Sequence, residues 1–186
     1  MLFWVLLIFG FDVPYVAVLT IICAVIHELG HVFSISRMNA GESLPKGHLS
    51  GFRIKRKVVL GYREEIIILL MGPLFNIIAF LLTIPFSSMM SGYVRIFGLL
   101  NLATAISNLL PVEGYDGYGI LIEIFKSTEN HKMITRLEFF SFVFSVAVSF
   151  LSLYLIDKFG SGYWIFGIFF AIMLTKLIKY GKSAIF

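Results

Sequence analysis

Three ionisable side chains within five residues give this sequence its clearest chemical signal. They are His27, Glu28 and His31 in the motif His-Glu-Leu-Gly-His. On a helix, residues four apart share a face, so the two imidazoles can bind one metal ion together. Glu28 lies one residue along and can act as the general base that activates water. The pattern predicts a zinc-dependent hydrolase. The alternative is a chance match whose side chains are merely satisfied inside a helix bundle.

The surroundings of the motif are apolar. Between Val13 and Ser36 the only acidic or basic side chain besides the two histidines is Glu28. Ionisable groups at membrane depth are costly and mark a functional site by default. The whole chain is 59% hydrophobic with 20 Phe, and its mean hydropathy is +0.92. This composition predicts an all-α polytopic membrane protein embedded in a lipid bilayer, and it gives no indication of a nucleic-acid partner.

The apolar runs predict about six transmembrane helices in a single domain, 1–186. The runs cover 2–11, 14–36, 66–85, 93–110, 139–156 and 163–178. The first is short for a hydrocarbon layer of about 30 Å, so whether it crosses stays open. We expect the third run to be interrupted at Gly72-Pro73. A three-span catalytic core at about 13–117 would then be flanked by accessory spans at 1–12 and 138–179.

Basic residues predict the orientation of these spans. Suppose that the loops 37–65 and 112–138 and the tail after Ile178 face the cytoplasm. All of the 15 Lys and Arg except Arg95 and Lys158 then lie on or beside that side, as positively charged cytoplasmic loops require. The second and fourth spans both run toward the cytoplasm. The candidate site is therefore expected near the cytoplasmic face.

A third metal ligand has to come from another part of the chain. Two histidines and one carboxylate, with a fourth position left open, form a recurring catalytic zinc site. Asp116 follows the fourth span and lies between Gly114 and Gly117, where the backbone can turn its carboxylate toward a metal. Asp beside Gly is also common in ordinary turns. Glu113 is a competing carboxylate, and spacing alone does not separate the two.

Residues 51–61 form the second open feature. The stretch has Gly at both ends and a charged middle, which predicts a β-hairpin between the second and third spans. A basic loop lying on anionic headgroups explains the same residues equally well.

The motifs together resemble the signature of site-2 proteases, the intramembrane zinc metalloproteases of peptidase family M50. The resemblance rests on His27-Glu28-x-x-His31, on Asn108-x-x-Pro111-x-x-x-x-Asp116-Gly117 and on Gly72-x-x-x-Asn76. It covers about residues 14–117 and implies one Zn²⁺ per chain. The implied metal ligands are His27, His31 and Asp116, the implied catalytic residue is Glu28, and the implied substrate-binding residues are Asn108, Pro111, Gly72 and Asn76. For Asn108, capping of a helix end is an equally good interpretation.

The resemblance also implies partners and a location. The expected substrate is a transmembrane or membrane-associated protein, with a membrane-embedded regulator as a further expected partner. The compact subgroup that includes stage IV sporulation protein FB is the most similar and implies a bacterial cell membrane. The CBS domain of that subgroup is not matched in the sequence up to Phe186. Regulation through such a domain and a sigma-factor substrate are therefore not carried over.

Two other classes of function compete with a protease. A metal-ion transporter would also place histidines and carboxylates within the membrane, but repeated half-helices and polar residues along a path are typical of that class. A non-catalytic relative that only binds membrane proteins would explain the same spans. All four residues of the predicted site are present in the sequence, which favours the enzyme.

Overall fold

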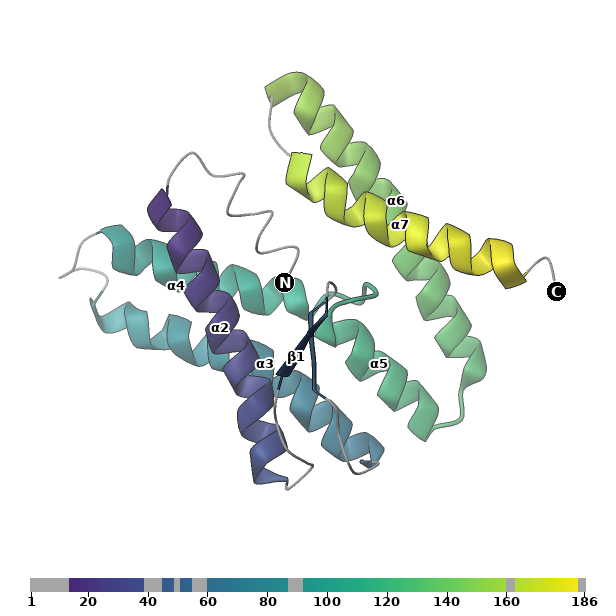
Figure 1. Ribbon diagram of the computed structural model, residues 1–186, viewed down its shortest axis with the longest axis horizontal. Helices are drawn as coiled ribbons and strands as arrows, with labels where there is room; N and C mark the ends of the chain where they lie inside the picture. Colours follow the sequence, from purple (N-terminus) through teal and green to yellow (C-terminus); the bar gives the residue numbers. More distant parts are fainter. Residues whose placement is uncertain are drawn as a thin grey trace.

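The computed structural model describes residues 14–38, 45–48, 51–54, 60–86, 92–159 and 163–183. Over these residues the chain is helical apart from one short pair of strands (Figure 1). The elements in chain order are α2 (Pro14–Arg37), β1 (Pro45–His48), β2 (Gly51–Ile54), α3 (Tyr62–Thr83), the 3₁₀ turn η1 (Ile84–Phe86), α4 (Gly92–Asn108), α5 (Asp116–Ser127), α6 (His131–Phe159) and α7 (Tyr163–Ser183).

Three of the described helices are long and apolar enough to cross a membrane. They are Val18–Arg37, Tyr62–Phe86 and His131–Lys158. A count of six spans is not confirmed. The 17 residues of α4 cover about 25 Å at about 1.5 Å per residue, which is less than the hydrocarbon thickness. In α7 the apolar stretch is Phe169–Ile178, and the expected span at 2–11 lies outside the described residues.

Helices α2, α3 and α4 pack on one another, and α5 packs on α3 (Figure 1). The crossing of α2 and α3 is close because residue 30 is Gly. A Cβ atom there would collide with the carbonyl oxygen of Met71 and would lie 3.0 Å from the Cα atom of Gly72. Small residues at such a crossing let helices in membranes approach. Helix α3 continues through the crossing with Pro73 inside it, so the interruption expected at Gly72-Pro73 does not occur.

The described helices bury many polar side chains and expose many large apolar ones. Thr20, Asn76, Asn101 and Thr104 are buried between helices, whereas many large apolar side chains are exposed along the same helices, including Val25, Leu29, Leu81, Leu82, Leu99 and Ile106. In water so much exposed apolar surface would be unfavourable. In a bilayer the acyl chains solvate it, and hydrogen-bonded polar groups belong between the helices. The distribution of side chains therefore agrees with insertion of these helices into a membrane.

The strand pair lies in the connection between α2 and α3. β1 and β2 are antiparallel, with Pro45 opposite Ile54 and His48 opposite Gly51. The predicted hairpin over 51–61 is not confirmed, because 51–54 pairs with a segment that precedes it. Residues 55–59 lie outside the described residues.

Helices α6 and α7 form a separate pair that reaches the other helices through α5 (Figure 1). Along α6 a row of serines is buried, namely Ser141, Ser145, Ser149 and Ser152. The hydroxyls of the last three donate to carbonyl oxygens of their own helix. Small side chains whose polar groups are satisfied in this way allow close helix packing.

Candidate metal centre

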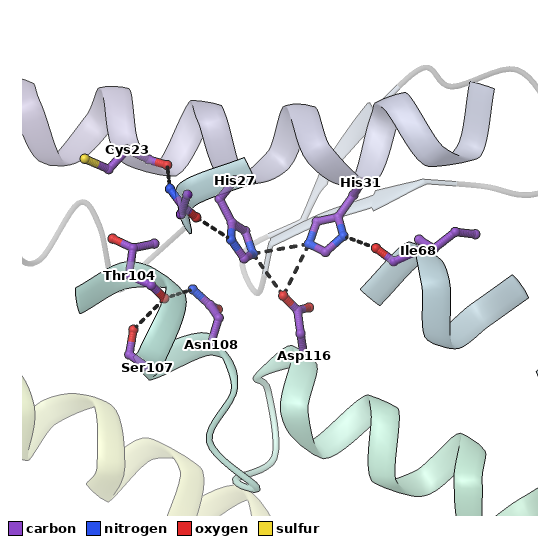
Figure 2. Close-up of polar contacts among 9 residues, drawn as sticks. Cys23, His27, His31, Ile68, Thr104, Ser107, Asn108 and Asp116 are labelled. Atoms are coloured by element: carbon purple, nitrogen blue, oxygen red, sulfur yellow. Dashed lines mark hydrogen bonds and ion pairs between the residues drawn. The ribbon is translucent and has the colours of Figure 1, made fainter. Parts of the chain in front are cut away.

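Two helices far apart in the sequence bring three of the predicted residues together (Figure 2). His27 and His31 lie on α2, and their Nε2 atoms are 3.2 Å apart. Asp116 is the first residue of α5, and its Oδ2 atom lies 3.0 Å from His27 Nε2 and 3.4 Å from His31 Nε2. The side chain of His27 is only 7% exposed, that of His31 13% and that of Asp116 15%. The cluster is therefore largely removed from solvent.

The other nitrogen of each ring determines where the hydrogen is. His31 Nδ1 lies 2.8 Å from the carbonyl oxygen of Ile68. A carbonyl oxygen can only accept, so Nδ1 of His31 carries the hydrogen. His27 Nδ1 lies 2.9 Å from the amide oxygen of Asn76 and donates to it in the same way. Both Nε2 atoms therefore present lone pairs in the neutral rings.

Three lone-pair atoms thus face one another with no hydrogen between them. The Asp116 Oδ2 atom is buried and has no hydrogen-bond donor among the described residues. A cation at the centre would make this repulsive arrangement attractive. Ligand atoms at about 2.05 Å from a tetrahedral zinc lie about 3.3 Å from each other. The observed separations of 3.0, 3.2 and 3.4 Å are close to that value. The three residues therefore fit a metal ion held by two nitrogens and one oxygen.

The backbone around Asp116 explains how its carboxylate reaches α2. Gly114 has a φ of +97° in the turn before α5, a conformation that glycine adopts at little cost. A Cβ atom on Gly117 would collide with the backbone of Leu109, so only glycine lets α5 begin this close to the end of α4. Asp116 occupies the first turn of α5, where the helix dipole favours a negative charge.

The electrostatics of Asp116 favour its ionised form. Burial on its own raises the pKa of this carboxyl group. When the imidazoles of His27 and His31 are protonated and donate to this carboxylate, their hydrogen bonds and charge outweigh burial and hold the pKa below its usual value, and a bound cation between neutral rings would act in the same direction. Burial also raises the pKa of the neighbouring Tyr115, which stays neutral. An ionised Asp116 beside two neutral imidazoles would offer a cation one anionic and two neutral ligand atoms.

Gly72 lies directly against both imidazoles. A Cβ atom on it would lie 2.5 Å from His31 Nε2 and 2.7 Å from His27 Cε1. The absence of a side chain there makes room for the rings. Gly72 and Asn76 were predicted to bind substrate, and that role remains a prediction. The contacts that the structure gives them are with the histidines.

Glu28 is half-buried on α2, next to His27. Its carboxylate is near enough to His31 to interact with it electrostatically. Among the hydrogen bonds of the described residues none involves this carboxylate. A role for Glu28 as the general base therefore remains a prediction.

The competing carboxylate, Glu113, faces a different set of residues. Its Oε2 atom lies 3.3 Å from Lys176 Nζ on α7. Its backbone N–H donates to Ser141 Oγ on α6 at 2.9 Å. The metal-binding group among the described residues contains Asp116 and not Glu113. The ambiguity that spacing leaves open is thus decided by geometry.

Asn108 and Pro111 lie between α4 and Asp116. Asn108 Nδ2 donates to the carbonyl oxygen of Thr104 at 2.9 Å (Figure 2), which is the capping contact expected at a helix end. Pro111 is half-buried in the connecting loop. A part in substrate binding stays a prediction for both residues.

Two contributors to the site are absent from the sequence-based prediction. They are the Ile68 carbonyl group and the Asn101 amide. The signal for Asn101 is a lone amide within the apolar run Phe97–Ile106, because an intramembrane polar residue usually has a partner. A backbone carbonyl leaves no signal in the sequence.

Comparisons with known proteins add no family to this geometry. No protein-family model matches the chain, and no curated protein matches it at a significant level.

Proposed function

We propose that this protein is an intramembrane zinc endopeptidase of the site-2 protease type. The observation that carries the proposal is the group of three converging lone-pair atoms on His27, His31 and Asp116, at separations that suit one tetrahedral ion. Two nitrogens and one carboxylate oxygen are a ligand set that zinc prefers. Its two histidines lie on a helix apolar enough to cross a membrane. A zinc-binding group next to an apolar helix that can cross a membrane favours the hydrolysis of a membrane protein.

The residues have separate roles in this proposal. His27, His31 and Asp116 hold the ion, which when bound would lower the pKa of water and polarise a scissile carbonyl group. Glu28 takes a proton from the attacking water and delivers it to the leaving amine. His27 and His31 cannot serve as that base, since their Nε2 lone pairs face the ion. The half-buried position of Glu28 supports proton exchange with the site.

The wider arrangement is part of the same proposal. The chain crosses a bacterial cell membrane six times, with both ends and the site toward the cytoplasm. The substrate is a transmembrane or membrane-associated protein whose helix unwinds locally, because helical carbonyls are otherwise engaged in hydrogen bonds. The strand pair Pro45–His48 and Gly51–Ile54 offers an edge on which an unwound peptide can add as a further strand. Asn108 and Pro111 position the peptide beside the ion.

Cleavage by the purified protein tests the proposal. We would reconstitute it in phosphatidylethanolamine and phosphatidylglycerol vesicles with a panel of single-span peptides that carry a fluorophore and a quencher around a Gly-Pro segment. Wild type should cleave some of these peptides, and Glu28→Gln should bind zinc normally and cleave none. Asp157→Asn makes the same chemical change on a side chain that is 77% exposed, and it should cleave like wild type.

Two results would contradict the proposal. Undiminished cleavage by Glu28→Gln would remove Glu28 from the mechanism. Zinc bound by the wild type, with no cleavage of any peptide, would favour a non-catalytic membrane protein.

A further inference from the structure

Two buried amides connect the metal centre to a helix that supplies no ligand. Asn76 lies on α3 and Asn101 on α4, and both side chains are completely buried. Asn76 Nδ2 donates to Asn101 Oδ1 at 2.8 Å and to the carbonyl oxygen of Cys23 at 2.9 Å. Asn101 Nδ2 in turn donates to the carbonyl oxygen of Phe97 at 2.9 Å. The Asn76 oxygen is left for His27 Nδ1.

The direction of every bond in this chain is dictated by backbone carbonyls. The Phe97 carbonyl can only accept, so the nitrogen of Asn101 faces it and the oxygen of Asn101 faces Asn76. Asn101 Oδ1 and the Cys23 carbonyl oxygen then both accept hydrogen bonds, so the nitrogen of Asn76 must face them. The Asn76 oxygen therefore points at His27 and accepts a hydrogen from Nδ1. An inverted Asn76 amide would set its oxygen against two other acceptors.

The consequence appears on the opposite side of the His27 ring. A hydrogen on Nδ1 leaves the lone pair on Nε2, which faces Asp116 at 3.0 Å. In the other tautomer a hydrogen on Nε2 would occupy the position that a metal ion requires. For His31 the Ile68 carbonyl makes this selection directly. For His27 the selection of the tautomer depends on the side chains of Asn76 and Asn101.

We propose that Asn101 is a positioning residue for the metal centre, which acts through Asn76 to hold His27 in the Nδ1–H tautomer. This inference rests on the metal site of the proposed function and is independent of proteolysis. Partners of this kind commonly change metal affinity by about 10- to 100-fold when they are lost.

The test substitutes Asn101 in two ways. Asn101→Leu is similar in size and removes one of the two acceptors of the Asn76 amide, so only the Cys23 carbonyl still opposes inversion of that amide and a change of the His27 tautomer. Asn101→Asp, protonated in its buried position, keeps a carbonyl acceptor for Asn76 and an O–H donor for Phe97. Thr104→Val is the control, because Thr104 is buried on the same helix and donates only to Leu100 of that helix.

Two measurements on detergent-solubilised protein follow the effect. Competition with a chromophoric chelator gives the zinc affinity. Nitrogen-15 NMR of the metal-free protein, labelled in histidine, gives the tautomer of each ring. The sequence has four histidines. When His48 and His131 are replaced by Gln, the only histidine signals that remain come from His27 and His31. His31 then serves as an internal reference, because its tautomer does not depend on Asn101.

The expected result is a zinc affinity about tenfold or more lower in Asn101→Leu, with His27 shifted toward the Nε2–H form and His31 unchanged. Asn101→Asp and Thr104→Val should resemble wild type in both measurements. Unchanged affinity and tautomer in Asn101→Leu would overturn the proposal. Equal losses in Asn101→Leu and Asn101→Asp would overturn it too, since packing alone would then explain the effect. A wild type that binds no zinc would instead refute the metal site itself.

Discussion

At the scale of single residues, the candidate metal centre depends as much on the missing side chain of Gly72 as on its three candidate ligands. The Nε2 atoms of His27 and His31 can lie 3.2 Å apart only because no side chain extends from Gly72. The backbone of α3 thus forms one wall of the site. It also supplies the Ile68 carbonyl that orients His31.

Gly72→Ala should therefore damage the site without unfolding the chain. The added methyl group would lie 2.5 Å from His31 Nε2, so the rings must move, and overpacking of this kind costs about 1–3 kcal/mol. We expect the zinc affinity to fall by at least about tenfold in chelator competition, as for loss of an orienting contact. Gly167→Ala on α7, where a Cβ atom would meet nothing within 4 Å, should bind zinc like wild type. Equal zinc affinity in both variants would show that the rings do not depend on this gap.

The sequence predicts the candidate metal ligands of this site better than the residues that orient those ligands. His27 and His31 follow from helical spacing. Position after the fourth span leaves Asp116 and Glu113 open, and the resemblance to site-2 proteases is what favours Asp116. The contact between Asn76 and Asn101 joins two helices side by side, and such a contact has no fixed separation along the chain. Its partners become visible only when the helices are packed.

At the scale of elements, α7 is tied to the loop that delivers Asp116. Lys176 is only 3% exposed, and its Nζ atom donates to the carbonyl oxygen of Glu138 at 2.9 Å. The same atom pairs with Glu113 at 3.3 Å and lies 5.8 Å from the centre of the Tyr118 ring. One ammonium group thus joins α6, α7, α5 and the loop before it. A lysine this deeply buried requires such partners.

Lys176→Met should weaken the attachment of α7. It keeps the apolar stem and removes contacts of a charged donor, each worth about 1.5–3 kcal/mol. Glu113 is 43% exposed and can be solvated by water, so the substitution does not leave a buried carboxylate without a partner. We expect a lower melting temperature for the detergent-solubilised protein by differential scanning fluorimetry. Lys158→Met, at a side chain 57% exposed, is the control. An unchanged melting temperature in Lys176→Met would show that Lys176 does not stabilise the attachment of α7.

Element boundaries were predictable where hydropathy and helicity coincide. The run 14–36 corresponds to α2 (Pro14–Arg37), and the run 93–110 to α4 (Gly92–Asn108). The run 139–156 underestimates α6, which extends from His131 to Phe159. Its first turns carry polar residues, and hydropathy reports the part of a helix that suits hydrocarbon rather than the helix itself. The predicted interruption at Gly72-Pro73 is wrong, because helix packing supports α3 through its proline.

At the scale of the whole molecule, the described helices are arranged for lipid. Exposed apolar side chains and buried serines and amides are the reverse of the distribution in a water-soluble bundle. The 29 residues of α6 cover about 44 Å at about 1.5 Å per residue. This length is enough to cross the hydrocarbon layer and extend beyond it.

The two ends of α6 should therefore be accessible from opposite sides of the membrane. The chain has one cysteine, Cys23, which is completely buried, so wild type is an unlabelled reference. Asp157→Cys should react with an impermeant maleimide added to intact cells. Ser127→Cys should react only after the cells are permeabilised, because the basic loops are predicted to face the cytoplasm. Reaction of both variants from the same side would refute a crossing by α6.

The zinc content of the purified protein tests the central claim most directly. We would measure zinc per chain in wild type, Asp116→Asn and Glu113→Gln, after loading and removal of free metal. The account predicts one zinc per chain in wild type and in Glu113→Gln, and a large loss in Asp116→Asn, because of these two carboxylates it is Asp116 that faces His27 and His31. Zinc retained equally by Asp116→Asn, or absent from the loaded wild type, would contradict it.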